Sequence, residues 1–214
     1  MKVLVVGANG QIGQKLIELL QESDKHEARA MVRKQEQAEA FKERGVETVI
    51  ANLEGSVDEL AGAVRGCDAV VFTAGSGGHT GLDKTLLIDL DGAVKTVEAA
   101  EKVGVKRFIM VSALQANNRE NWSDQIRPYY AAKHYADRAV EQSSLIYTIV
   151  RPGGLVNEPG TGKVKAGEQL ERGSIPREDV ASVIFRVLGE AHTFNRSFDL
   201  VSGEQSIGEA LKSI

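Results

Sequence analysis

The 214-residue chain has little of several things that mark particular classes of protein. Cys67 is its single cysteine, which excludes an internal disulfide, and its place before an apolar run favours a small buried side chain over a reactive thiol. No apolar run approaches the roughly 18 residues of a membrane-spanning helix. The histidines, His26, His79, His134 and His192, lack the spacing of metal ligands, so no metal site is predicted.

Basic residues are not in excess either. The 26 Lys and Arg residues are outnumbered by 30 Asp and Glu residues, the formal net charge is −4, and no basic block occurs, which argues against a nucleic-acid surface. Met1 leads directly into an apolar run, with no charged leader or cleavable segment. We therefore expect a soluble, cytoplasmic protein that uses neither nucleic acid nor a membrane as a partner.

What is present is a regular alternation of apolar runs and segments of helical period. This pattern predicts an α/β fold, a doubly wound parallel sheet with helices on both faces. The expected strands cover residues 3–6, 28–32, 47–50, 69–73, 107–111 and 147–150. The first expected helix begins after Gly10. The other expected helices cover residues 35–44, 57–64, 83–103 and 129–142.

The first strand runs through three glycines into the first helix. Gly7 allows a tight turn, Gly10 lets the backbone approach a pyrophosphate, and Gly13 lets the helix pack closely on the sheet. Helix amides then point at the phosphates, which is typical of a Rossmann-type dinucleotide site. The plainer interpretation is a tight strand-to-helix turn without a ligand. The residues predicted to hold the pyrophosphate are Gly7, Asn9, Gly10, Gln11, Ile12 and Gly13.

The other strand ends carry mostly small or polar residues. Because the carboxyl ends of parallel strands meet at one edge of the sheet, they are expected to line the same ligand crevice. They are Arg33, Asn52, Leu53, Ala74, Gly75, Ser76, Ser112, Pro152, Gly153, Gly154 and Leu155.

The end of the second strand bears on the choice of coenzyme. An acidic residue there would bind the ribose diol of NAD, but Arg33 and Lys34 stand in its place. A guanidinium meets phosphate in bidentate fashion, so the pair favours NADP (NADPH) over NAD. Alternatively, both residues form only the solvated start of the second helix.

After residue 150 the regular alternation of apolar runs and helical segments ends. Residues 151–176 are expected to be rich in loops, followed by a helix at 177–190, a strand at 197–201 and a helix at 206–212. We expect a single NAD(P)-binding domain over residues 1–214, in which residues 153–176 and 191–214 form a small appendage on the substrate side.

Taken along its length, the chain resembles the short-chain dehydrogenase/reductase superfamily. The resemblance is carried by Gly7-x-x-Gly10-x-x-Gly13, Asn52-Leu53, Thr73-Ala74-Gly75, Val111-Ser112-Ala113, Tyr129-x-x-x-Lys133 and Arg151-Pro152-Gly153. The glycine spacing and the short C-terminal part point to its atypical branch, which includes NAD-dependent epimerase/dehydratase-like and NmrA-like proteins. The resemblance implies an NADP-dependent oxidoreductase or epimerase that acts on a small carbonyl or hydroxyl compound. It also allows a homodimer through the helices at 83–103 and 129–142.

The spacing of Tyr129 and Lys133 places both side chains on one helix face. The ammonium is expected to stabilise the phenolate and lower the pKa of Tyr129, which suits acid or base work near neutral pH. In the resembled mechanism Tyr129 protonates a carbonyl oxygen, Ser112 holds that oxygen, and Lys133 also binds the nicotinamide ribose. The helix asparagine that relays protons in the family has no clear counterpart. Two alternatives stay open for Asp89 and Asp91: one of them faces the site, or, as we favour, both are solvated helix residues.

Two other functions stay open on the same scaffold. An NmrA-like protein would bind NADP without chemistry and sense redox state through a protein partner. Some atypical members instead reduce flavins or biliverdin-type compounds. The sequence carries no motif that identifies the substrate.

Overall fold

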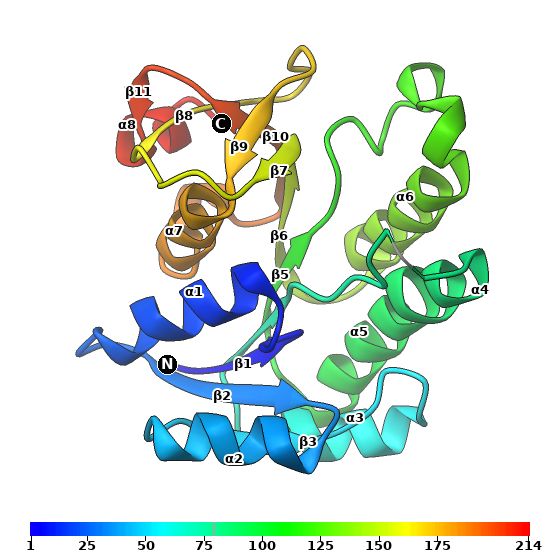
Figure 1. Ribbon diagram of the computed structural model, residues 1–214, viewed down its shortest axis with the longest axis vertical. Helices are drawn as coiled ribbons and strands as arrows, with labels where there is room; N and C mark the ends of the chain where they lie inside the picture. The colour runs from blue at the N-terminus through cyan, green and yellow to red at the C-terminus, as the bar shows by residue number, and fades with distance from the viewer. Residues whose placement is uncertain (79) are drawn as a thin grey trace.

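The described residues, 1–78 and 80–214 of the computed structural model, form a nine-stranded and mostly parallel sheet with helices on both faces (Figure 1). His79 lies outside the described residues. The strand order is β11-β8-β10-β6-β5-β4-β1-β2-β3. The strands are β1 (Lys2–Val6), β2 (Glu27–Val32), β3 (Glu47–Ile50), β4 (Ala69–Phe72), β5 (Arg107–Val111), β6 (Ile146–Pro152), β8 (Lys163–Gly167), β10 (Arg196–Ser202) and β11 (Gln205–Ser206).

Two hydrophobic cores lie on opposite faces of the sheet because alternate side chains of each strand point to opposite sides. Val3 and Val5 of β1 enter one core, whereas Leu4 and Val6 enter the other. The first core is covered by α1 (Gln11–Gln21), α2 (Gln35–Glu43), α7 (Arg177–Val187) and α8 (Ile207–Lys212). The second is covered by α3 (Val57–Val64), α5 (Gly92–Val103) and α6 (Arg127–Gln142). Both faces of β1 are therefore apolar, as a buried parallel strand requires.

The strand order reverses beside β1, since β2 and β3 lie on one side of it and β4 on the other. A crevice at the carboxyl ends of the strands is expected at such a switch point. The Rossmann-type fold class is confirmed, and each of the six predicted parallel strands corresponds to one of β1 to β6. Cys67 is buried beside the second core, as predicted, and burial raises the pKa of its thiol.

The helix predicted over residues 83–103 is wrong in its first half. The segment consists of a short α4 (Leu82–Lys84), a π-helical stretch η1 (Thr85–Asp91) and then α5. Over so few residues the wider π turn leaves almost the same apolar pattern as an α turn. A change of this kind is often found at functional sites.

The loop-rich segment predicted over residues 151–176 is also wrong in part. It contains the end of β6 together with β8 and a two-stranded parallel sheet of β7 (Gly154–Val156) and β9 (Ser174–Pro176). β8 runs antiparallel to both β10 and β11 at one edge of the main sheet. These strands are short, and in β8 only Val164 is fully buried, so they leave little periodic signal. Three single-turn helices complete the described fold: η2 (Arg119–Asn121), η3 (Asp124–Ile126) and η4 (Ala191–Thr193).

Neither a membrane-spanning helix nor a metal-binding cluster occurs among the described residues. None of the helices there is long and apolar enough to cross a bilayer. Within residues 1–78 and 80–214, no group of three or more His, Cys, Asp or Glu side chains is placed to hold a metal ion.

Candidate active site

The turn from β1 into α1 leaves no room for a side chain. Gly7 has φ +86°, and a Cβ on it would lie 2.7 Å from the backbone nitrogen of Ala74. A Cβ on Gly13 would lie 2.4 Å from the carbonyl oxygen of Gly7. The Gly10 amide donates to that same oxygen at 2.9 Å, and Gly10 caps α1 without a side-chain hydrogen bond. The start of α1 is therefore held close to the carboxyl end of β1, where its amides suit a phosphate.

A pocket of about 400 Å³ opens beside this turn. Its floor comes from the ends of β1, β2 and β4, the place expected for an adenosine and pyrophosphate. The pocket's lining includes eight of the predicted coenzyme residues: Gly7, Asn9, Gly10, Arg33, Leu53, Ala74, Gly75 and Ser76. Gln11, Ile12, Gly13, Lys34 and Asn52 are outside the lining. The glycine cradle and the pocket together fit a dinucleotide.

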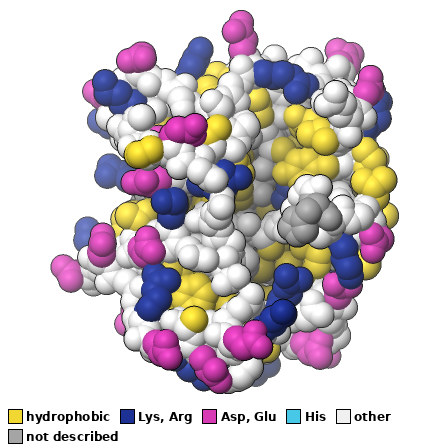
Figure 2. All heavy atoms as spheres, viewed as in Figure 1, with side chains coloured by type: hydrophobic (Ala, Val, Ile, Leu, Met, Phe, Trp, Pro, Cys, Tyr) yellow, Lys and Arg dark blue, Asp and Glu magenta, His cyan; other side chains and the backbone are white. Residues whose placement is uncertain are grey.

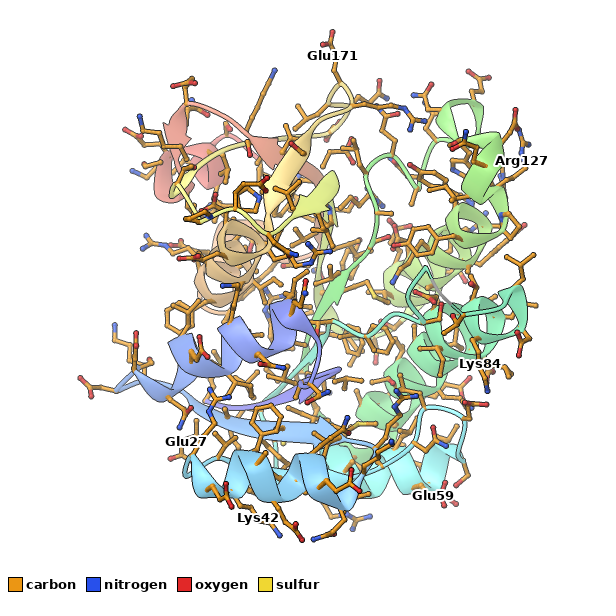
Figure 3. All side chains as sticks on the ribbon, in the orientation of Figure 1. Glu27, Lys42, Glu59, Lys84, Arg127 and Glu171 are labelled. Atoms are coloured by element: carbon orange, nitrogen blue, oxygen red, sulfur yellow. The ribbon has the colours of Figure 1, made fainter. Side chains whose placement is uncertain are left out.

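Two cationic side chains, Arg33 and Lys84, line the pocket. Arg33 is exposed at the end of β2 and lines the pocket, whereas Lys34 is the N-cap residue of α2. Figure 3 labels Lys84, which belongs to the short α4. The Nζ of Lys84 lies 2.7 Å from a carboxylate oxygen of Glu54. The sequence reasoning missed Lys84, because nothing in the local pattern shows that the short α4 reaches this pocket.

Of the two residues predicted after β3, Leu53 lines the pocket and Asn52 lies outside its lining. Leu53 is buried in the second core and packs against Gly92, where an added Cβ would lie 3.0 Å from the Cβ of Leu53. The side-chain oxygen of Asn52 accepts a hydrogen bond from the Glu54 amide at 3.1 Å and so stabilises the local turn. Leu53 thus reaches the pocket wall, and Asn52 shapes the loop beside it.

Tyr129 and Lys133 lie together on α6, and the structure adds Asp89 to them. The Lys133 ammonium is buried, donates to the Val111 carbonyl at 3.3 Å, and lies 3.3 Å from a carboxylate oxygen of Asp89. It is 5.8 Å from the centre of the Tyr129 ring. The other Asp89 oxygen accepts the Ser76 amide at 3.0 Å. Asp89 therefore joins the pocket loop to the helix that carries Tyr129.

The prediction that Asp89 is solvated is wrong, since only 1% of its surface is exposed. Asp91 is exposed, as predicted, and pairs with Lys95 at 2.7 Å. The wider π-helical stretch that ends at Asp91 carries Asp89 on its buried side and Asp91 on its outer side. An isolated acidic residue in the sequence gives no sign of this burial.

The expected direction of the Tyr129 pKa is also wrong. Burial raises the pKa of the Tyr129 hydroxyl; Lys133 opposes this, and the Asp89 carboxylate reinforces it. Burial alone lowers the pKa of Lys133, but the neighbouring Tyr129 and Asp89 outweigh it, so that pKa is raised. Tyr129 is therefore a phenol, and Lys133 an ammonium, across the neutral range.

Ser112 lies deeper than a substrate-binding hydroxyl requires. Its hydroxyl is buried without a hydrogen-bond partner among the described residues, and its amide donates to the Val150 carbonyl at 2.8 Å. Nearby, the buried Asp137 accepts from Arg151 at 2.8 Å. Burial raises the pKa of Asp137, and Arg151 opposes this. The structure brings Tyr129 and Lys133 together but does not place the Ser112 hydroxyl on an open surface.

The predicted coenzyme residues at the end of β6 and after it lie outside the pocket lining. The Pro152 carbonyl accepts from the Leu114 amide at 2.9 Å, and the Gly154 amide donates to the Gly173 carbonyl at 2.8 Å. A Cβ on Gly153 would lie 2.3 Å from that Gly173 oxygen. Leu155 follows with 37% of its surface exposed. These contacts tie β6 to β5 and β9 and leave Leu155 free to face a ligand.

Asp199 is another buried carboxylate that the sequence reasoning missed. Its two oxygens accept the amides of Gln115 at 3.1 Å and Leu170 at 3.2 Å. Gln115 has a positive φ of 58°, so this contact holds a strained turn. Asp199 thereby fixes two loops that follow β5 and β8.

An apolar cluster lies next to Tyr129. It consists of Ala113, Ala116 and Tyr130, with Trp122 and Tyr129 packed against them. Figure 2 shows a central hollow with hydrophobic side chains along the side on which α6 lies in Figure 1. This side of the crevice can bind the apolar part of a substrate.

Comparison with known proteins agrees with this geometry. A family model described as NAD(P)H-binding matches residues 7–191. The uncharacterized sugar epimerase YhfK of Bacillus subtilis is 61% identical over 214 residues, which cover 100% of both chains. Sanguinarine reductase of Eschscholzia californica is 28% identical over 258 residues, which cover 99% of this chain and 93% of that protein.

Solved structures show the same relationship. A protein of Bacillus halodurans, described as a candidate NAD-dependent epimerase/dehydratase, has a TM-score of 0.92 at 45% identity and covers 100% of both chains. A short-chain dehydrogenase/reductase of Veillonella parvula, in complex with NADP, has a TM-score of 0.76 at 20% identity over 94% of each chain, a likeness of fold alone. The chain belongs to the NAD(P)H-binding family, in the atypical branch of the short-chain dehydrogenase/reductase superfamily.

Proposed function

We propose that the protein is an NADP(H)-dependent reductase or epimerase-type enzyme for a small carbonyl or hydroxyl compound, with Tyr129 as its proton donor. The observation that carries this proposal is the position of Tyr129 and Lys133. They stand beside Asp89, which also holds the loop of the dinucleotide pocket. Asp89 links Tyr129 and Lys133 to the pocket loop, which supports a proton donor close to the coenzyme, as hydride-transfer chemistry requires.

NADPH is preferred over NADH in this proposal because of charge. Arg33 lines the pocket at the end of β2, so a 2′-phosphate on the adenosine ribose would lie near its guanidinium. The Veillonella protein was solved with NADP, which supports the same choice. The names of YhfK and sanguinarine reductase support carbonyl or hydroxyl chemistry of the oxidoreductase or epimerase type.

A bound coenzyme and Tyr129 together supply the hydride and the proton that reduction of a carbonyl group needs. The reduced nicotinamide, when bound, supplies a hydride to the carbonyl carbon. Tyr129 donates its hydroxyl proton to the carbonyl oxygen, and the product is an alcohol. Lys133 orients Tyr129 and the nicotinamide ribose, while the apolar cluster beside Tyr129 excludes water. Tyr129 then regains a proton from solvent.

Removal of one hydroxyl tests this proposal. Tyr129→Phe is expected to lower kcat for NADPH oxidation against a panel of carbonyl compounds, sugars included, by about 10²-fold or more. Its dissociation constant for NADPH is expected to stay unchanged, because the lost hydroxyl is not part of the pocket lining. Tyr135→Phe is the matched control, since Tyr135 lies on the same helix but is 50% exposed. Equal turnover of Tyr129→Phe and wild type would exclude Tyr129 as the donor.

A second function is favoured by the burial of Ser112. Ser112 is buried, and its hydroxyl helps to lower the pKa of the buried Asp137, so it is not exposed to a substrate oxygen. A protein that binds NADP and senses redox state would need the pocket but not that hydroxyl. Tight NADPH binding, no turnover of any carbonyl compound, and a protein partner retained by only one redox form would establish the sensor instead of the enzyme.

A further inference from the structure

One part of the coenzyme pocket's wall is not held by packing. The short helix α4 lies at the outer edge of the molecule, directly before η1 in the chain (Figure 1). None of its three residues is buried, so α4 adds no side chain to either hydrophobic core. Segments that bury little apolar surface open at a low cost in free energy. Lys84 of α4 nevertheless lines the pocket, as does Ile88 four positions later.

One ion pair ties α4 to another part of the chain. The Lys84 ammonium donates to both carboxylate oxygens of Glu54, at 2.7 Å and 2.9 Å. Glu54 lies in the turn between β3 and α3. Within residues 1–78 and 80–214, these are the only side-chain hydrogen bonds that α4 makes to a different element or turn. The place of α4 at the pocket therefore depends on this pair.

Glu54 is the fixed partner of the two. Its amide donates to the Asn52 side-chain oxygen at 3.1 Å, and the Gly55 amide donates to the Asn52 carbonyl at 2.9 Å. The Lys95 ammonium of α5 donates to the Gly55 carbonyl at 3.0 Å, which anchors the same turn from a second side. None of these bonds involves Lys84, whose four-carbon stem is flexible. Lys84 is therefore the partner that can let go.

The pair is suited to opening and closing. Lys84 and Glu54 have 41% and 30% of their side-chain surfaces exposed, so solvent and salt weaken their attraction. Glu54 is outside the pocket lining, whereas Lys84 is part of it. A long side chain whose charged end is held in this way lies along the pocket wall. The wall also contains Leu53 and Ile88, whose apolar side chains suit the adenine ring.

We propose that Lys84 and Glu54 form a clasp that holds α4 against the coenzyme pocket and slows the release of the bound dinucleotide. With the pair formed, α4 closes the wall beside the coenzyme. With the pair broken, α4 can move outward and the coenzyme can leave. This inference goes beyond the proposed function, since it concerns exchange of the coenzyme and requires no role of Tyr129.

Glu54→Gln gives the sharpest test, because two physical effects predict opposite results. NADPH is an anion, so loss of a nearby carboxylate would by itself strengthen its binding and slow its release. Loss of the clasp instead speeds release, by about threefold for an exposed ion pair. The rate is measured by stopped flow, with excess NADP⁺ displacing NADPH and the NADPH fluorescence as the signal. We expect faster release from Glu54→Gln.

Further variants show whether the two residues act as a pair. Lys84→Gln is also expected to speed release about threefold, and the double variant no more than either single one, because the same contact is lost in all three. Exchange of the charges, Glu54→Lys with Lys84→Glu, is expected to bring the rate back toward that of wild type. At about 1 M salt, the rates of wild type and Glu54→Gln are expected to converge, because the pair is screened.

Asp58→Asn is the matched control. Asp58 of α3 pairs with Lys102 of α5, and neither residue lines the pocket. This variant removes one carboxylate from an exposed ion pair of the same kind, and its release rate is expected to equal that of wild type. The free energy of unfolding in urea is expected to stay near the wild-type value in Glu54→Gln, so a change in release would not reflect a loss of stability.

Several results would overturn the clasp. They are unchanged or slower release from Glu54→Gln, equally fast release from Asp58→Asn, and rate effects that multiply in the double variant. Faster release from Lys84→Gln alone would show that the ammonium binds the coenzyme directly instead. A wild-type protein that does not bind NADPH would overturn the clasp together with the coenzyme site. Faster release from Glu54→Gln together with wild-type turnover of Tyr129→Phe would support the clasp and refute only the proposed proton donor.

Discussion

Gly13→Ala is the substitution whose effect the structure defines most sharply. The added Cβ would lie 2.4 Å from the Gly7 carbonyl oxygen and 2.8 Å from the Ala8 Cα. Ordinary contact begins at 3.4 Å, so α1 must move by about 1 Å relative to β1, because both neighbours are backbone atoms. Overpacking of this kind costs about 1–3 kcal/mol of folding free energy.

The same movement displaces the amides at the start of α1 from the pyrophosphate. We expect the dissociation constant for NADPH to rise about tenfold or more, measured by calorimetric titration, and the free energy of unfolding in urea to fall by about 2 kcal/mol. Gly62→Ala is the matched control, since Gly62 lies inside α3 and its added Cβ meets nothing within 4 Å. That variant is expected to gain about 0.5–1 kcal/mol of stability and to bind NADPH normally.

A Gly13→Ala variant with the wild-type dissociation constant for NADPH and the wild-type free energy of unfolding in urea would contradict this prediction. Loss of stability without loss of affinity would show that α1 moves but does not hold the coenzyme. Loss of both in Gly62→Ala as well would show that any added methyl group disturbs the protein, whatever its surroundings.

Three other predictions address the coenzyme, the proton donor and the loops. Arg33→Ala should weaken NADPH binding about tenfold and NADH binding hardly at all, because only NADPH carries the 2′-phosphate; equal losses would remove the preference. Since burial raises the Tyr129 pKa, its acid form persists as pH rises, and kcat for reduction should stay level from about pH 7 to about pH 9, whereas a fall centred near neutrality would contradict this. Asp199→Ala removes the acceptor for the Gln115 and Leu170 amides and should lower the urea-unfolding free energy by about 2 kcal/mol or more; no change would mean that water replaces the carboxylate.

The alternation of strands and helices could be predicted because it rests on local periodicity. The apolar runs are short and bounded, and both faces of strands such as β1 are buried, so each run identifies a parallel strand. The turn at Gly7 could also be predicted, since its φ of +86° and the close approach of Ala74 require glycine. These features depend on residues near one another in the sequence.

The buried pair of Asp89 and Lys133 could not be predicted, because its two residues are far apart in the sequence. Asp89 and Lys133 are 44 positions apart, and nothing near Asp89 indicates that a π-helical stretch buries it. The i, i+4 spacing of Tyr129 and Lys133 suggested a lowered pKa for Tyr129. That expectation omitted the burial of Tyr129 and the Asp89 carboxylate, which both raise its pKa. Asp199 was missed for the same reason, since the amides that it holds belong to two distant loops.

A crystal of the protein soaked with NADPH would show where each part of the coenzyme binds. We expect the pyrophosphate at the amides of Gly10 and Ile12, the 2′-phosphate beside Arg33, and the nicotinamide ring next to Tyr129 and Lys133. An empty pocket at saturating NADPH, or a nicotinamide ring directed away from Tyr129, would contradict it.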